Sequence, residues 1–322
     1  MRALVTGAGG FLGAALVRAL AARGDTVRAL VRRRADALDA AGVEVVLGDA
    51  TDPHDVRPAV RGCDVVFHLA GVRRAASAAE FTRVNAGSTR VALEACAAEA
   101  PGLRRFVLAG SLAAAGPSRT GRRESDPLEP AEPYGASKAE AERIALGFAG
   151  RLPVAIARPP RIMGPGDREN LLFFRIARAG LALGFSGPPR PLSWIDVDDC
   201  AQGFLLLAER PEAVGEAFFL ASPETTTVEG LQLEAARALG IRTRRLRVPA
   251  SALRATALLN DVAGRVIGRK LPISRKLAAQ ILAPGWVCDP AKARERLGFV
   301  ASTSLADSID RAARWYRARG LV

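Results

Sequence analysis

A tyrosine and a lysine four residues apart are the most informative pair of reactive side chains in this sequence. Tyr134 and Lys138 begin and end the string Tyr-Gly-Ala-Ser-Lys. At a helix start, residues four apart project from one face. A lysine ammonium beside a phenol favours the phenolate, which brings a group with a pKa of about 10 toward neutrality. Such a tyrosine can exchange a proton with an oxygen whose carbon exchanges hydride. The alternative is an ordinary exposed helix start.

Two further polar residues could assist this pair. Ser111 follows a predicted strand at residues 104–109, and ligands bind at the carboxyl ends of strands in open α/β sheets. Its hydroxyl could hold a substrate oxygen beside Tyr134, or it could be a cap or turn residue. Asn85, on a helix predicted at 78–98, could anchor backbone or water behind Lys138, or lie exposed.

A glycine-rich turn supplies a second kind of chemistry near the N-terminus. It joins a predicted strand at residues 2–6 to a predicted helix at 11–23. Glycines let the backbone approach a pyrophosphate, and the free N–H groups of a helix start complement its charge. This arrangement favours dinucleotide binding over a plain strand-to-helix turn. The residues expected at the cofactor are Gly7, Gly10, Phe11, Leu12 and Gly13.

Arginines follow the second predicted strand, at residues 26–31. No Asp or Glu lies between Val27 and Arg34. An acidic residue at this place bonds the ribose 2′-hydroxyl of NAD, whereas arginine pairs with the 2′-phosphate of NADP. Arg32 and Arg33 therefore favour NADP, with NAD as the alternative and a solvated arginine loop as the non-functional interpretation.

Two later strand ends complete the expected cofactor crevice. Asp49 and Ala50 follow the strand at 43–47, where the carboxylate could accept from an adenine amino group or cap the next helix. His68 lies near the end of the strand predicted at 64–69, and we expect it to be a structural residue rather than a catalytic base. The small residues after it could pass close to a ribose; the expected contacts are Leu69, Ala70 and Gly71.

The elements that position these residues alternate between strand and helix. This order predicts an α/β fold with a doubly wound parallel sheet, followed by a smaller, mostly helical C-terminal region. Residues 1–165 form the expected cofactor-binding domain, with strands at 192–197 and 217–220 returning to it. Residues 166–191 and 223–322 form the expected substrate-binding region, including a Gly/Pro-rich connection at 184–191 and amphipathic helix at 251–282 broken at Pro272.

Composition narrows the class of protein. The chain has 322 residues, 49% of them hydrophobic, and no apolar run long enough to span a membrane. A start within the first strand leaves no room for a signal peptide, so we expect a cytoplasmic protein. The net charge of +13 comes from scattered arginines without interleaved aromatic residues, which argues against nucleic-acid binding. Two histidines and four widely spaced cysteines make a metal site unexpected.

Taken together, the motifs resemble the extended short-chain dehydrogenase/reductases, often called the NAD-dependent epimerase/dehydratase family. The resemblance covers essentially the whole chain and implies a Rossmann sheet. It implies Tyr134 as acid/base, Lys138 as its activator and ribose ligand, and Ser111 as donor to the substrate oxygen. It also implies that backbone near Pro159 and Ile162 faces the nicotinamide, and that Asn85 and Leu69 to Gly71 line the middle of the cofactor. The matching segments are 6–13, 49, 68–71, 84–85, 111, 134–138, 158–159, 162–167, 194–199 and 289–299.

Departures from the family pattern bear on the substrate. Nucleotide-sugar members usually carry an Arg-Asp-aromatic string where this chain has Leu192-Ser193-Trp194, although Arg190 lies nearby. The sequence is more similar to the branch with dihydroflavonol-reductase-like and 3β-hydroxysteroid-dehydrogenase-like proteins, whose substrates are uncharged and often hydrophobic. Segments 171–174, 181–185 and 251–282 could line an apolar pocket, or simply pack in the core.

Three functions follow as hypotheses. The first is an NADP(H)-dependent oxidoreductase that interconverts a ketone and a secondary alcohol on a mostly apolar small molecule. The second is an epimerase or dehydratase for a nucleotide sugar, with a tightly bound cofactor. The third is a non-enzymatic nucleotide-binding relative. The basic helix region at 251–282 could also touch a membrane surface, and the helices at 78–98 and 137–150 predict a homodimer by analogy with related proteins.

Overall fold

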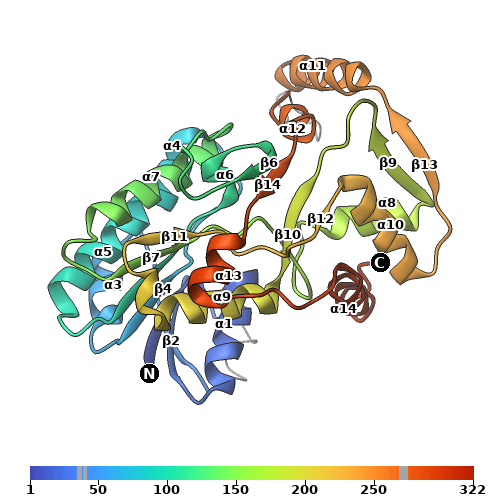
Figure 1. The fold of residues 1–322 in the computed structure, drawn as a ribbon. Coiled ribbons are helices and arrows are strands. Elements are labelled where there is room, and N and C mark those ends of the chain that lie inside the picture. Colours follow the sequence, from blue (N-terminus) through green and yellow to red (C-terminus); the bar gives the residue numbers. More distant parts are fainter. Residues whose placement is uncertain (35–37, 39–41, 268–274) are drawn as a thin grey trace.

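A parallel sheet with helices on both faces forms the larger part of the molecule (Figure 1). The computed structural model describes residues 1–34, 38, 42–267 and 275–322. Within them, seven parallel strands follow the order β11-β7-β5-β4-β1-β2-β3. The strands are β1 (Arg2–Thr6), β2 (Thr26–Val31), β3 (Glu44–Leu47), β4 (Val65–His68), β5 (Arg105–Ala109), β7 (Val154–Ala157) and β11 (Glu216–Phe218). The order reverses between β1 and β4, which is where ligands bind in such sheets.

Alternating side chains of the central strand fix which helices cover each face. Ala3 and Val5 belong to one hydrophobic core, formed with α1 and α9, whereas Leu4 belongs to a second core on the other face. Strands that are apolar on both faces require helices on both sides, so the predicted doubly wound sheet is confirmed. The flanking helices are α1 (Phe11–Ala22) and α9 (Val197–Glu209) on one face, and α3 (Pro53–Val60), α5 (Ser88–Glu99) and α7 (Pro133–Gly147) on the other.

The helix predicted at 78–98 is built from three segments. Helix α4 (Ala78–Phe81) leads into a π-helical turn, η1 (Thr82–Gly87), and α5 continues from it. Asn85 lies in this wide turn and is buried. Single π-turns often occur at functional sites, because the extra residue turns side chains to new directions.

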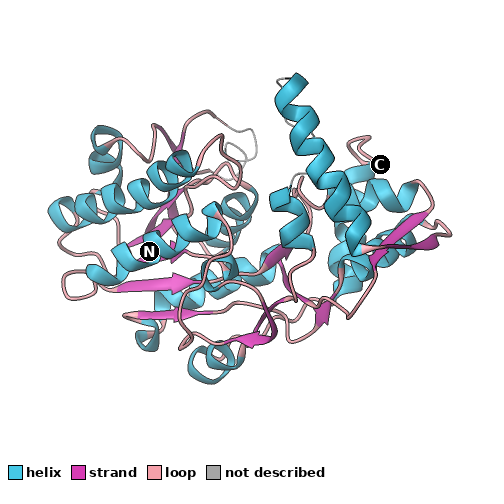
Figure 2. Ribbon diagram, turned by 90° about the horizontal axis from the view of Figure 1, so that it is seen from above, coloured by secondary structure: helices cyan, strands magenta, loops and turns pink. Residues whose placement is uncertain are grey.

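The smaller part lies beside the large sheet in both views (Figures 1 and 2). Its helices pack around a core that contains Phe174, Trp194 and Tyr316. One sheet in it has the order β12-β10-β14-β6, with β8 beside β10, and β9 pairs in parallel with β13. These elements are β6 (Ser118–Arg122), β8 (Arg161–Met163), α8 (Leu171–Arg178), β9 (Leu181–Phe185), β10 (Leu192–Asp196), β12 (Thr225–Thr226), α10 (Val228–Leu239), β13 (Arg244–Val248), β14 (Trp286–Cys288) and α14 (Leu305–Arg317).

Two expectations about this region need correction. Of the two strands expected to return to the large sheet, β11 does so beside β7, but β10 pairs with β8, β12 and β14 instead. The residues before β10 are rich in proline, which cannot donate to a sheet ladder. The connection expected at 184–191 begins later, because β9 extends to Phe185.

The remaining helical elements are α6 (Leu112–Ala115), η2 (Pro211–Ala213), α11 (Ala250–Ile267), α12 (Arg275–Ile281) and α13 (Ala291–Leu297). Among them, η2 contacts β7 and β11 of the large sheet, and α11 packs against α12. Helices α11 and α12 cover much of the predicted amphipathic segment. The break expected at Pro272, with Arg269 and Lys270, lies outside the described residues.

No helix in the described ranges is long and apolar enough to cross a membrane. Nor do the described His, Cys, Asp and Glu side chains form a group that could hold a metal ion.

Candidate functional site

The glycine turn after β1 is shaped by close backbone contacts. Gly7 has a φ of +71°, and a Cβ on it would lie 2.8 Å from the backbone of Leu69 and Ala70. A Cβ on Gly13 would lie 2.2 Å from the Gly7 carbonyl oxygen. Helix α1 begins after Gly10, without a capping side chain or an acidic residue in its first turn. Its first N–H groups can therefore receive an anion.

A cavity of ≈ 390 Å³ opens at this turn, at the switch point of the sheet. It collects the ends of β1, β2, β3 and β4, as the sequence predicts for a dinucleotide crevice. The predicted residues that line it are Gly7, Gly10, Arg32, Arg33, Asp49, Ala50, Leu69, Ala70 and Gly71. Phe11 and Leu12 instead pack partly buried against the core below α1.

The carboxylate of Asp49 is engaged by its own loop. Its Oδ1 accepts from the backbone N and the hydroxyl of Thr51, each at 2.8 Å. These bonds, the backbone one foremost, hold the pKa of Asp49 below its usual value, with a contribution from Arg32. Asp49 is not the helix cap considered above, because Asp52 caps α3 by accepting from His54 N. An adenine contact by Asp49 stays a prediction.

His68 is a structural residue at the end of β4. It is 1% exposed, and its ring nitrogens pair with Thr6 Oγ1 at 2.9 Å and Ser88 Oγ at 3.1 Å. Burial lowers its pKa to about 3, so the imidazole is neutral at physiological pH. The Thr6 hydroxyl also accepts from Ala70 N at 3.2 Å. These hydrogen bonds therefore fix the position of the backbone that faces the cavity.

Asn85 links that backbone to helix α7. Its Oδ1 accepts from Val72 N at 2.8 Å, and its Nδ2 donates to Val72 O at 3.1 Å and to Ser137 Oγ at 2.8 Å. A Cβ on Gly71 would come within 2.8 Å of Asn85 Oδ1, so glycine is needed there. Asn85 thus anchors backbone, as one interpretation of the sequence held, and it does not line the cavity.

The three predicted catalytic residues surround the end of β5. Lys138 is 6% exposed and donates to the Ala109 carbonyl at 2.7 Å. Ser111 follows that strand, and its Oγ accepts from Ala113 N at 3.1 Å, so it also caps the short helix α6. Tyr134 is half-buried one turn before Lys138, with its ring against Phe81.

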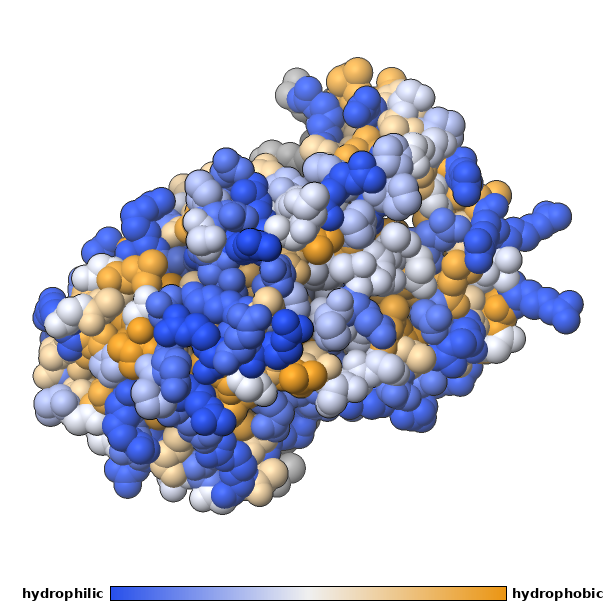
Figure 3. Space-filling view, in the orientation of Figure 1, coloured by the Kyte–Doolittle hydropathy of each residue, from blue (hydrophilic) through white to orange (hydrophobic). Residues whose placement is uncertain are grey.

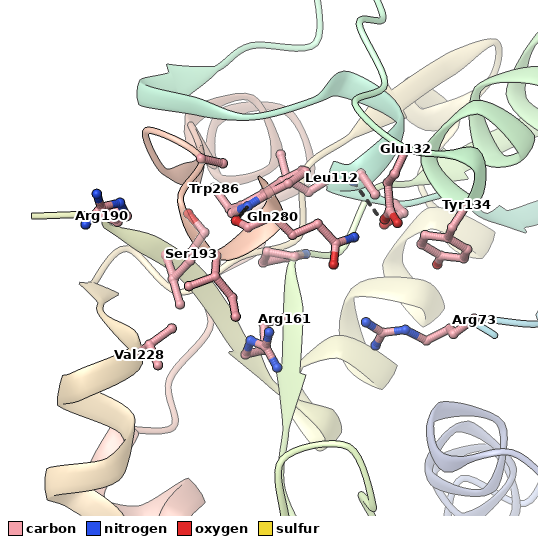
Figure 4. A pocket seen from close by; sticks show the side chains of 16 residues that line it. Arg73, Leu112, Glu132, Tyr134, Arg161, Arg190, Ser193, Val228, Gln280 and Trp286 are labelled. Carbon is pink, nitrogen blue, oxygen red and sulfur yellow. Dashed lines mark hydrogen bonds between the residues drawn. The ribbon is translucent and has the colours of Figure 1, made fainter. Parts of the chain in front are cut away.

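A second cavity, of ≈ 210 Å³, contains Ser111 and Tyr134 together (Figure 4). Val72 lines the first cavity and Arg73 the second, so one loop connects them. Lys138 lies behind, with its Nζ 3.5 Å from the position of a Cβ on Gly71. The arrangement places a phenol and a hydroxyl where a bound carbonyl could meet both.

The apolar lining of this cavity comes from other segments than expected. Leu171 and Phe174 are buried in the C-terminal core, and β9 pairs with β13, so neither 171–174 nor 181–185 reaches the cavity. The apolar lining residues are Leu112, Ala113, Pro160, Leu192, Val228, Ile281, Ala283 and Trp286. Of the described part of the predicted segment 251–282, only Gln280 and Ile281 line the cavity.

Pro159 and Ile162 lie beside the cavity and outside its lining. The Pro159 carbonyl accepts from Leu112 N at 3.0 Å, and the Ile162 carbonyl accepts from Asn170 Nδ2 at 3.0 Å. Their neighbours Pro160 and Arg161 do line it. A nicotinamide contact by Pro159 and Ile162 stays a prediction.

Several polar lining residues were missed by the sequence analysis. They are Arg73, Glu132, Arg161, Ser193 and Gln280; Arg190 was noted only as a nearby arginine. Two of them had a usable signal, because Arg73 follows the β4 loop and Glu132 lies two residues before Tyr134. Gln280 and Trp286 come from the distant C-terminal region, so only the fold brings them to the site.

A buried ion pair lies behind Ser111. The Arg158 Nε and a terminal nitrogen donate to Glu142 Oε2 at 2.9 and 2.8 Å, with side chains 5% and 0% exposed. Burial raises the pKa of Glu142, and the Arg158 charge and hydrogen bond oppose that shift. A Cβ on Gly110 would lie 2.3 Å from Glu142 Oε1, so glycine before Ser111 makes room for this carboxylate.

Comparison with known proteins agrees with this geometry. Residues 3–221 match the NAD dependent epimerase/dehydratase family. The chain is 32% identical to sterol demethylase protein B of Methylococcus capsulatus, over 100% of both chains. It is 31% identical to ceramide reductase of Caulobacter vibrioides, covering 98% of this chain and 94% of that one. It is also 31% identical to a farnesyl-dihydroquinoline-oxide ketoreductase of Stigmatella aurantiaca, covering 96% and 95%.

Among solved structures, the chain resembles the dTDP-glucose 4,6-dehydratase DesIV of Streptomyces venezuelae, a structure with NAD bound. The TM-score is 0.79 at 26% identity, and the match covers 99% of this chain and 98% of that one.

Proposed function

The chain belongs to the NAD-dependent epimerase/dehydratase family, and we propose that it is an NADP(H)-dependent oxidoreductase that interconverts a ketone and a secondary alcohol. The observation that carries the proposal is the shared cavity of Ser111 and Tyr134, with Lys138 behind and the dinucleotide crevice adjoining. Relatives named as reductases support this reaction class.

The proposed mechanism assigns one task to each side chain. A nicotinamide dinucleotide held in the crevice by the Gly7–Gly10 turn and Arg32 would supply or accept the hydride. Tyr134 gives a proton to the carbonyl oxygen during reduction and takes it back during oxidation. Ser111 donates a hydrogen bond that orients this oxygen. Lys138 donates to the Ala109 carbonyl and lies at the Gly71 end of the crevice, which supports its proposed role as a ligand of the cofactor ribose.

Replacement of Tyr134 tests the mechanism. Tyr134→Phe should lower turnover by about 10²–10⁴-fold, since a positioned acid/base contributes that much, while NADPH affinity stays nearly unchanged. The measurement is NADPH oxidation with a panel of ketones, beside fluorescence titration of NADPH. Tyr316→Phe is the matched control, because Tyr316 is the other tyrosine, lies in the C-terminal core, and has no hydrogen-bond partner among the described residues. Full activity in Tyr134→Phe would overturn the mechanism.

Preference for NADP over NAD is the finer part of the proposal. Arg32 and Arg33 are exposed at the end of β2 and line the cofactor cavity. Guanidinium groups there suit a 2′-phosphate, and Asp49 is already engaged by Thr51. We expect Arg32→Asp to weaken NADPH binding by about tenfold or more and to spare NADH. Arg119→Asp, an exposed arginine outside both cavities, is the control. Equal affinities of the wild type for NADPH and NADH would contradict the assignment.

The proposed substrate is a mostly apolar small molecule. The leucine, isoleucine, valine and tryptophan side chains around the cavity support this choice. The runner-up is an epimerase or dehydratase of a nucleotide sugar, which DesIV exemplifies. Leu192 lines the cavity where such family members usually carry arginine, and leucine cannot pair with a diphosphate. Stoichiometric cofactor in the purified protein, without net NADPH use, would favour the runner-up.

Location and assembly are further parts of the proposal. The four cysteines are free and buried, which suits a reducing compartment such as the cytoplasm. A homodimer through the helices α5 and α7 is proposed from the family resemblance, and sedimentation at micromolar concentration tests it.

A further inference from the structure

The second cavity, which is called the substrate cavity from here on, carries charges that do not fit a wholly uncharged substrate. Three guanidinium groups line it, from Arg73, Arg161 and Arg190, against the single carboxylate of Glu132. Arg190 donates weakly to the Ser186 carbonyl at 3.4 Å and lies at the far side in Figure 4. Arg73 lies on the side of Tyr134, with its guanidinium turned toward Arg161, which lies near the middle of the view.

Arg73 lies next to the proposed acid/base. Its guanidinium carbon is 5.9 Å from the centre of the Tyr134 ring, and the side chain is exposed. Among the described residues it has no hydrogen-bond or ion-pair partner. The neighbouring Arg74 differs, since it points to Glu169 with a 2.8 Å ion pair and does not line the cavity.

Arg161 is held in place by neutral groups. One terminal nitrogen donates to Asn170 Oδ1 at 2.7 Å, and the guanidinium lies 5.3 Å from the centre of the Phe173 ring. No described carboxylate forms an ion pair with it. Burial, and then the charge of Arg73, lower the pKa of Arg161 to about 10, while the charges of Asp167 and Glu169 partly oppose that shift. The two guanidiniums therefore repel each other across the cavity, and a bound anion would relieve that repulsion.

We propose that Arg73 and Arg161 bind an anionic group of the substrate, a carboxylate or a phosphate, close to the carbonyl that Tyr134 and Ser111 receive. This inference rests on the proposed function for the location of the carbonyl. It makes the substrate an amphiphile, with an acidic group at the arginines and an apolar part toward Leu192, Ile281 and Trp286. Guanidinium groups suit both acids, since their paired N–H donors match two oxygens.

Binding to the protein–NADPH complex tests the inference without turnover. The probes are 3-hydroxyoctanoate and its methyl ester, which differ in the negative charge and in one methyl group, and calorimetry measures their binding. We expect the acid to bind about tenfold or more tightly than the ester, since hydrogen bonds to charged groups are strong. Arg73→Met and Arg161→Met should each remove most of that preference and leave the ester nearly unaffected. Arg74→Met, whose side chain is 81% exposed in its ion pair with Glu169, should change neither affinity.

The outcomes separate this inference from the proposed reaction. Equal binding of acid and ester, or an equal loss of both in the arginine variants, would overturn the anion site, and so would binding of neither if UDP-glucose also fails to bind. UDP-glucose is the phosphate probe: if it binds in an Arg73- and Arg161-dependent way and the acid does not, the anion site stands with a phosphate as its ligand. The proposed ketone reaction is tested separately from the anion site. Full activity in Tyr134→Phe would overturn the reaction mechanism and would not bear on anion binding.

Discussion

His68 shows how a single buried side chain couples folding to pH. Its pKa falls from 6.5 to about 3 on burial, so the unfolded chain binds a proton between these values and the folded chain does not. The free energy of unfolding therefore decreases as pH falls from 6.5 toward 3, by about 1.4 kcal/mol per pH unit from this residue. Denaturant titrations between pH 5 and 8 measure that slope.

The His68→Gln variant isolates this contribution. Four carboxyl groups, on the half-buried Glu124 and the buried Glu142, Asp167 and Asp196, have raised pKa values and act in the opposite direction. Because the variant keeps all four, the difference between the two slopes belongs to His68. The other histidine, His54, is exposed on α3. We expect a less stable variant at pH 8 with a shallower loss toward pH 5, and identical slopes would refute the argument.

The Glu142–Arg158 pair makes a second prediction for stability. Glu142→Ala leaves the Arg158 guanidinium buried without its carboxylate, which should lower the free energy of unfolding by about 3–5 kcal/mol. The double variant Glu142→Leu/Arg158→Met should recover part of the loss, since it removes both buried charges. Urea unfolding of the three proteins measures this. A single variant as stable as the wild type would contradict it.

The glycine turn predicts that one added methyl group disturbs a whole element. A Cβ on Gly13 would lie 2.2 Å from the Gly7 carbonyl, so Gly13→Ala must move α1 away from β1. We expect a loss of about 1–3 kcal/mol in unfolding free energy, with weaker NADPH binding. In Gly147→Ala, at the end of α7, the new Cβ meets no described atom within 4 Å, so this variant should be as stable as the wild type or slightly more.

Elements with local signals were predictable, and pairings between distant segments were not. The β1–glycine–α1 unit and the Tyr134–Lys138 spacing follow from residues close in sequence, so they could be read directly. The place of β10 could not, because a short apolar strand carries no mark of its partner. Leu171 and Phe174 illustrate the same limit, since an apolar pocket wall and an apolar core use the same side chains.

At the scale of the whole molecule, the active cleft is made by two parts that the chain connects repeatedly. Strand β14 brings Trp286 beside Leu192 of β10 and Ser118 of β6, close to Ser111. The cofactor cavity belongs to the large sheet alone, whereas the second cavity has walls from both parts. The residues that line the first cavity could therefore be predicted from the sequence better than those that line the second.

Helix α11 gives the last prediction, a contact with an anionic membrane surface. It exposes Leu258, Leu259 and Val262, the last two 68% and 53% exposed, and it buries Leu253. Figure 3 shows apolar surface at the top of the molecule, where α11 lies in Figure 1. Arg254 flanks this apolar face, and β13 before it exposes further arginines. Apolar side chains bordered by cations are typical of helices that lie in the membrane interface.

Co-sedimentation with vesicles tests this contact. Wild-type protein should bind phosphatidylglycerol vesicles and less so phosphatidylcholine vesicles, and the double variant Leu258→Ser/Leu259→Ser should bind the former about tenfold more weakly, because two apolar side chains are lost. Leu47→Ser is the control, because it removes a leucine that is 59% exposed on β3, the edge strand of the large sheet, far from α11. This variant should bind the vesicles as the wild type does. If wild type and both variants stay in the supernatant, α11 has no membrane role. Helix α12 packs against α11 and contributes Gln280 and Ile281 to the substrate cavity. A membrane contact of α11 would therefore bring the cavity close to a surface in which an amphiphilic substrate dissolves.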